Sequence, residues 1–112
     1  MSNNHINYIE FKSKDLEKTE KFYSAVFGWK FTTYGPTYIS FEESGVLGGF
    51  ELTDKPIQNG VLVVLYHENL KIIKAKVIEN GGEISVDTFE YPGGRRFQFL
   101  DHSGNELSVW SE

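Results

Sequence analysis

An internal repeat with a period of 54 residues constrains this chain more than any other feature. Moving the sequence by 54 positions places Asp15 over Asn69 and Gly28 over Gly82. The match is one of pattern more than of identity, and it indicates that one supersecondary unit has been duplicated. The chain has 112 residues, which is enough for one core but too few for two independent domains. We therefore expect a single domain.

Each repeat is predicted to contain a strand, a helix and three further strands. Apolar alternation and helical spacing give, in repeat one (about 5–52), a strand at 6–11, a helix over 15–27 and strands at 29–34, 37–42 and 46–52. After a linker at about 53–60, repeat two (about 61–112) gives a strand at 61–66, a helix from 69 to about 80 and strands near 83–88, 96–100 and 106–110. Asp15 or Ser13 can cap the first helix, and Gly28 can end it. The fold class is α+β, with each helix covering its own sheet.

Two segments carry a family resemblance: FYSAVFGWKF at the end of the first helix and RRFQFLDHSGNELSVW before the chain end. With the duplicated order, they resemble the vicinal-oxygen-chelate superfamily, which includes glyoxalase I, bleomycin-resistance proteins and extradiol dioxygenases. The resemblance covers nearly the whole chain. It implies two βαβββ repeats that form a cup-shaped mixed sheet with one helix outside each half. In that family the concave face holds the ligand and, in the enzymes, a divalent metal.

Strand alternation predicts which side chains point into such a cup. We expect Phe11, Phe97 and Phe99 to pack under the helices. The inward positions are then Ile6, Tyr8, Glu10, Leu62, Val64, Tyr66, Arg96, Gln98, Glu106, Ser108 and Trp110.

Metal-dependent relatives take one ligand, usually His or Glu, from each of four strands, and the resemblance places these positions at Tyr8, Glu51, Leu62 and Ser108. Only Glu51 is a plausible donor there. A lone carboxylate cannot hold a divalent cation at useful affinity, because affinity needs several donors in fixed geometry. We therefore predict no metal and no cofactor.

The three histidines do not restore a metal site. We expect His5 in the solvated start of the chain, His67 as a loop or cap residue, and His102 in a polar turn.

The predicted site is an aromatic pocket. Its candidate ligand-binding residues are Tyr8, Tyr38, Glu51, Leu62, Tyr66, Arg96, Gln98, Ser108 and Trp110. Ring faces with a few polar groups suit a planar or cationic ligand. Glu10 and Glu51 are the candidates for general acid and base work; the alternative is that they are solvated or pair with Arg96. Trp29 and Phe22 are expected in the core, and the loop 90–95 is either a lid or a plain hairpin connection.

Three functions follow, from different classes. The first is a metal-independent small-molecule-binding protein of the antibiotic-resistance or sequestering kind, with a homodimer as an open alternative to the monomer. The second is a glyoxalase I-like lyase or isomerase that uses a divalent metal placed differently from the family pattern. The third is an interaction module that exposes a sheet edge or an aromatic patch to a protein.

Charge and hydropathy limit the partners. The formal net charge of -5 disfavours nucleic acid and anionic membranes. No apolar run approaches the roughly 20 residues of a membrane helix, and the start MSNNHINYIE lacks a basic segment followed by an apolar one. We expect a soluble cytoplasmic protein.

Overall fold

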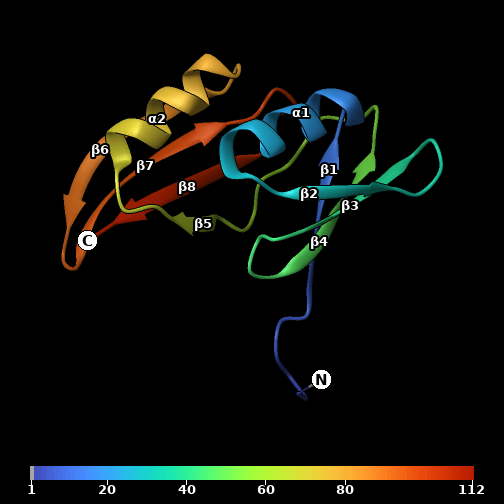
Figure 1. Ribbon diagram of the computed structural model, residues 1–112, viewed down its shortest axis with the longest axis horizontal. Helices are drawn as coiled ribbons and strands as arrows, with labels where there is room; N and C mark the ends of the chain where they lie inside the picture. The colour runs from blue at the N-terminus through green and yellow to red at the C-terminus, as the bar shows by residue number, and fades with distance from the viewer. Residues whose placement is uncertain (1) are drawn as a thin grey trace. The chain divides into compact units, whose positions relative to one another are not determined.

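The computed structural model describes residues 2–112, which form two compact units that divide between Lys55 and Pro56 (Figure 1). The first unit contains β1 (Tyr8–Ser13), α1 (Leu16–Phe27), β2 (Lys30–Thr33), β3 (Tyr38–Glu42) and β4 (Leu47–Leu52). The second contains β5 (Val63–Tyr66), α2 (Leu70–Glu79), β6 (Glu83–Tyr91), β7 (Gly94–Leu100) and β8 (Glu106–Ser111). Both units have the order βαβββ, which confirms the predicted repeat and the α+β fold class.

The two sheets share one topology. Their strand orders are β1-β4-β3-β2 and β5-β8-β7-β6. In each, the first and last strands of the unit pair in parallel, and the remaining pairs are antiparallel. A parallel pair needs a crossover, which the helix and the two middle strands supply here.

The helix of each unit begins one residue after the predicted start, because Asp15 and Asn69 are the N-cap residues. The Asp15 side chain accepts a hydrogen bond from the Lys18 amide, and Asn69 does the same for the Ile72 amide. Both satisfy an amide that has no partner within the helix. Gly28 ends α1 with φ 75°, a left-handed conformation that favours glycine.

Aromatic rings fill the space between α1 and its sheet. Tyr23 is fully buried and stacks on Trp29 at 4.8 Å between ring centroids, and Trp29 stacks on Phe41 at 4.5 Å. Phe50 of β4 is also fully buried and lies 5.1 Å from Phe11 of β1. Trp29 is thus a core residue as expected, and the half-buried Phe11 packs against the core ring of Phe50.

The core of the second unit is mostly aliphatic on the helix side. Ile73 and Val77 of α2 face the sheet and are buried, as are Phe97, Phe99 and Leu107 of the two central strands. Phe97 and Phe99 lie under the helix, as predicted.

The turn before β8 explains part of the family motif. One oxygen of Asp101 accepts hydrogen bonds from the amides of Ser103, Gly104 and Asn105, at 2.9 to 3.0 Å. The Asn105 side chain donates to the other oxygen at 3.0 Å. The residues DHSGN thus build a turn, with Gly104 at φ 102°.

Several predicted strand boundaries were wrong, among them those of β1, β5 and β6. β1 begins at Tyr8, so Ile6 lies before the strand and is 79% exposed rather than on a sheet face. β5 begins at Val63, so Leu62 lies just before it. β6 continues to Tyr91, which leaves a tight hairpin turn over Pro92 and Gly93, with Gly93 at φ 109°.

Of the two alternatives for residues 90–95, the structure therefore shows the hairpin connection and not a lid.

Within residues 2–112, no helix is long and apolar enough to cross a membrane.

Candidate ligand-binding faces

Each sheet has a face turned away from its helix, which we call its open face. In the first unit, strand alternation and register place Tyr8, Glu10 and Lys12 of β1 on this face beside Leu47, Gly49 and Glu51 of β4. Tyr38 of β3 is the register partner of Glu51. The structure thus brings Tyr8, Tyr38 and Glu51 together, as the sequence predicted, and adds Lys12 to them.

Two tyrosines meet on this open face. Their hydroxyls, on Tyr8 and Tyr38, lie 2.5 Å apart. The missing side chain of Gly49 makes room for this contact, because a Cβ there would stand 2.2 Å from the Tyr38 hydroxyl. Burial raises the pKa of Tyr38, and hydrogen bonds to Tyr8 and Glu10 raise it further. Tyr38 is therefore a neutral hydroxyl at physiological pH.

Both acidic candidates of the first unit interact with Lys12. Glu51 forms an ion pair with Lys12, and Glu10 lies 3.9 Å from the same ammonium group. The hydrogen bond to Glu51 is the largest cause that raises the pKa of Lys12. Within the first unit, Lys12 is thus the cation beside both carboxylates.

A shallow groove of about 500 Å³ borders the tyrosine pair. Tyr8, Tyr38 and Leu47 line it, together with Tyr34 and Lys30 from the neighbouring hairpin. Leu47 is 54% exposed although it lies in a strand, so this end of the open face presents apolar surface.

The open face of the second unit carries a continuous row of four side chains, one from each strand. Register pairs Tyr66 with Trp110, Trp110 with Arg96, and Arg96 with Phe89. We call these four residues the aromatic row. Tyr66 and Trp110 make an edge-to-face contact with 5.2 Å between ring centroids. The predicted residues Tyr66, Arg96 and Trp110 thus lie side by side.

The remaining candidates of this unit have partners within the sheet. Gln98 donates to Glu106 at 3.1 Å, and Ser85 donates to the same carboxylate oxygen at 2.7 Å. Ser108 is fully buried and donates to the Phe97 carbonyl at 2.9 Å. Leu62 lies outside the strand and offers only an apolar side chain.

These contacts bear on the four positions at which metal-dependent relatives hold their metal. Tyr8 is hydrogen-bonded to Tyr38, Glu51 is paired with Lys12, and Ser108 is hydrogen-bonded to a carbonyl. Leu62 has no donor atom. Among residues 2–112, no three His, Asp or Glu side chains cluster closely enough to hold an ion. The residues at these positions do not fit a divalent metal.

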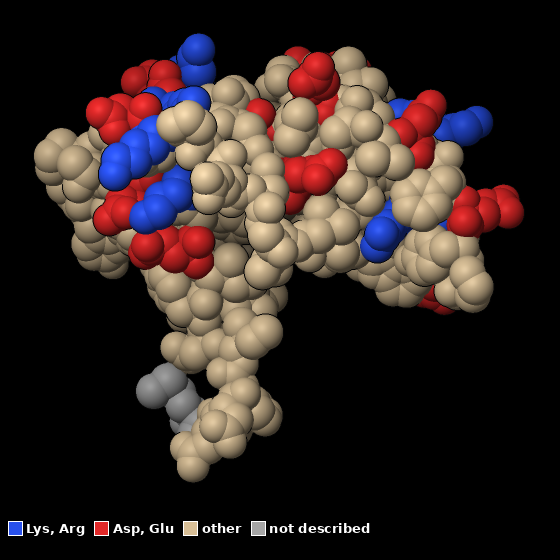
Figure 2. Space-filling view, turned by 180° about the vertical axis from the view of Figure 1, so that it is seen from behind, with Lys and Arg blue, Asp and Glu red and all other residues tan. Residues whose placement is uncertain are grey.

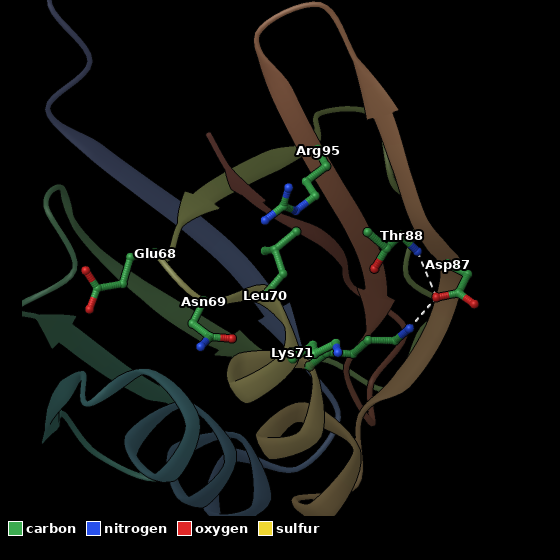
Figure 3. Close-up of a pocket in the computed structure, with 8 residues that line it drawn as sticks. Glu68, Asn69, Leu70, Lys71, Asp87, Thr88 and Arg95 are labelled. Carbon is green, nitrogen blue, oxygen red and sulfur yellow. Dashed lines mark hydrogen bonds and ion pairs between the residues drawn. The ribbon is translucent and has the colours of Figure 1, made fainter.

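A second hollow lies on the helix side of the other sheet, at the start of α2 (Figure 3). It measures about 600 Å³, and its labelled lining residues include Arg95, Thr88 and Lys71. Lys74 forms an ion pair with Asp87 across it, and this contact lowers the pKa of Asp87. Sequence reasoning missed this hollow, because it considered only the concave face.

The charged side chains do not separate by sign on the face that Figure 2 shows, where acidic and basic groups lie next to one another. This surface gives no broad field of one sign that would attract a polyanion.

The comparisons with known proteins agree with this geometry. Residues 5–109 match the model of the Glyoxalase/Bleomycin resistance protein/Dioxygenase superfamily. The fold, with its duplicated βαβββ unit, is the one that this class of proteins shares. The chain belongs to this superfamily, as the motifs indicated.

Solved structures share the fold at low sequence identity. A glyoxalase-related enzyme from Fulvimarina pelagi has a TM-score of 0.83 at 17% identity, over 97% of this chain and 88% of that one. A genomically encoded fosfomycin resistance protein from Listeria monocytogenes has a TM-score of 0.84 at 15% identity, over 99% and 95%. No curated protein matches the sequence.

Sequence reasoning also missed two neighbours of Arg96. The predicted strand ends near residue 88 and the predicted loop contains Tyr91, yet Phe89 and Tyr91 both lie in β6 on the open face and contact the Arg96 guanidinium. Their alternation across Glu90, directly before a Pro-Gly turn, was the signal that could have extended the strand.

Proposed function

We propose that this chain is a metal-independent, small-molecule-binding member of its superfamily that takes up an aromatic or cationic compound on its open sheet faces. The aromatic row carries the proposal. Tyr66 is 52% exposed and Phe89 is 36% exposed, so large rings stand at the surface of a sheet rather than in its core. Flat ligands gain both buried apolar area and ring stacking on such a surface.

The side chains at the family's metal positions support the metal-independent half of the proposal. A divalent cation would have to displace Lys12 from Glu51 and would find neither a second carboxylate nor an imidazole at Tyr8, Leu62 or Ser108. Sequestration of a toxic compound requires only that the protein binds it. A protein without metal ligands at these four positions can still perform that function.

We further propose that the chain acts as one domain, in the cytoplasm. A monomer and a homodimer remain the two candidate assemblies, and sedimentation of the purified protein separates them.

One experiment tests the function directly. The purified protein is analysed for bound metals, and its unfolding temperature is measured with divalent cations and with a panel of aromatic neutral, cationic and anionic compounds. We expect no stoichiometric metal and stabilisation by aromatic compounds. A divalent metal that copurifies at one equivalent, with activity on a thiohemiacetal that chelation abolishes, would instead establish the glyoxalase-type lyase.

Two substitutions locate the binding surface. Each substitution tests the open face of one unit, and we expect either Trp110→Ala or Tyr8→Ala to weaken binding of the best aromatic compound by about tenfold, because it removes a ring from the face that binds the compound. Ile72→Ala is the control, since Ile72 is 51% exposed on α2, the helix that covers the opposite side of the second sheet from the aromatic row. Unchanged affinity in both ring variants would show that the ligand binds elsewhere.

A further inference from the structure

Arg96 stands out on the open face of the second unit because its charge has no acidic partner. Its Nε atom is fully buried and has no hydrogen-bond acceptor. Among residues 2–112, no ion pair includes this guanidinium. A buried charged donor without an acceptor lowers the stability of the folded protein, so the presence of an arginine at this position needs an explanation.

Aromatic rings hold the guanidinium in place instead. Its central carbon lies 5.3 Å from the centroid of the Phe89 ring and 5.6 Å from that of the Tyr91 ring. Such cation–π contacts offset part of the cost of desolvating the charge, but they supply no acceptor for an N–H group. The two rings therefore orient the planar guanidinium of Arg96, but its N–H groups form no hydrogen bond within the described part of the chain.

The nearby carboxylates do not provide that acceptor. Glu106 accepts hydrogen bonds from Gln98 and Ser85, and Glu112 accepts one from Tyr66 at 3.3 Å. Glu90 lies between Phe89 and Tyr91 in β6, so strand alternation turns its side chain to the other face of the sheet. The guanidinium on the open face is thus oriented, yet it forms no ion pair with any of these carboxylates.

Two aromatic rings adjoin this cation. Trp110 is the register partner of Arg96, and Tyr66 continues the row on the next strand. A ligand whose ring lies against Trp110 would bring a substituent within reach of the guanidinium. A carboxylate matches the guanidinium fork with two parallel hydrogen bonds, whereas an ammonium group would be repelled by it.

We propose that the aromatic row binds a planar organic anion, with the ring against Trp110 and a carboxylate on Arg96. This inference rests on the proposed function and narrows it, because it removes the cationic compounds from the candidate ligands and makes Arg96 the residue that determines specificity.

Three probes that share one ring system test the inference on the full chain: 2-naphthoate, 2-naphthamide and 2-naphthylmethylammonium. Their dissociation constants are measured by titration calorimetry at pH 7 and low salt. We expect the wild-type protein to bind the carboxylate at least tenfold more tightly than the amide, and the ammonium compound most weakly. This comparison needs no variant, so it is decisive even if a substitution prevents folding.

The residue is then tested with a matched pair of variants. Arg96→Met removes the charge from the open face, whereas Arg95→Met removes the same charge from the helix side of the same strand. We expect the preference for the carboxylate over the amide to disappear in Arg96→Met and to persist in Arg95→Met. Loss of the preference in both variants would reveal an effect of net charge alone and would overturn the assignment to Arg96.

The two proposals fail in different ways. If the three probes bind equally and Trp110→Ala abolishes their binding, the open face is a ligand site but the inference of an anionic ligand is wrong. If none of the probes binds, the proposed function is wrong for this face, and the inference falls with it.

Discussion

Two adjacent glycines in β4 show how single residues shape the two faces of the first sheet. A Cβ at Gly48 would stand 2.2 Å from the Ile9 carbonyl oxygen and 2.3 Å from the Phe41 ring. A Cβ at Gly49 would instead meet the hydroxyl end of Tyr38, on the open face. Backbone and a buried ring cannot move aside, whereas the far end of a half-buried side chain can.

We therefore expect Gly48→Ala to lower the free energy of unfolding by about 2–3 kcal/mol, as in an overpacked core, and Gly49→Ala by less than about 1 kcal/mol. Urea unfolding measures both values. Gly49→Ala should nevertheless displace Tyr38 from Tyr8, visible as changed aromatic proton shifts of both tyrosines. Equal destabilisation by the two substitutions would contradict this division of the faces.

Tyr38 also has a predicted effect on alkaline stability. Its pKa in the folded protein is raised, first by burial and then by hydrogen bonds to Tyr8 and Glu10, from an ordinary value of 10.0. Above pH 10 the unfolded chain releases the proton more readily than the folded one, so stability falls as the pH rises further. Between pH 9.5 and 11 the urea midpoint should fall more steeply for the wild type than for Tyr38→Phe. Parallel curves would show that Tyr38 ionises normally.

At the scale of elements, the helix starts are the best-predicted part of the fold. Asp15 and Asn69 are typical N-cap residues at equivalent places in the repeat, and local hydrogen bonding alone decides such positions. The end of β6 was missed for the opposite reason. Strand pairing with β7 determines where it ends, and its polar, bulged sequence hides that pairing.

We expect Asp15→Ala and Asn69→Ala each to reduce the free energy of unfolding by about 1 kcal/mol, since each leaves a helix amide without its acceptor. Chemical denaturation measures the change. Asp15→Asn serves as the control for the first helix, because asparagine caps as well as aspartate and should preserve stability. A cap-to-alanine change with no effect would imply that the helix end finds another acceptor.

The sequence predicted on which face of a sheet each candidate residue lies, but it did not predict the contacts between these residues. Alternation placed Tyr8, Tyr66 and Trp110 on open faces, because strand geometry fixes the side of each residue. The sequence did not indicate that Lys12 would neutralise Glu51, nor that Phe89 would lie over Arg96. Such contacts join different strands, so they depend on register, which a pattern within one strand does not give.

At the scale of the whole molecule, each unit has only about half of the chain, a length at which an isolated core is marginal. We therefore expect the protein to unfold as one cooperative domain. Trp29→Phe and Trp110→Phe each leave one tryptophan, in the second and first unit respectively. In each variant the midpoint reported by fluorescence should equal that reported by far-ultraviolet circular dichroism. Separate midpoints would mean that the two units fold independently.

The central claim is that the chain binds an aromatic ligand without a metal. Calorimetric titration of 2-naphthoate into protein stripped with EDTA tests this claim most directly. We predict saturable binding with the same dissociation constant in EDTA and after addition of one equivalent of Zn²⁺. Binding that appears only after the metal is restored would contradict the claim.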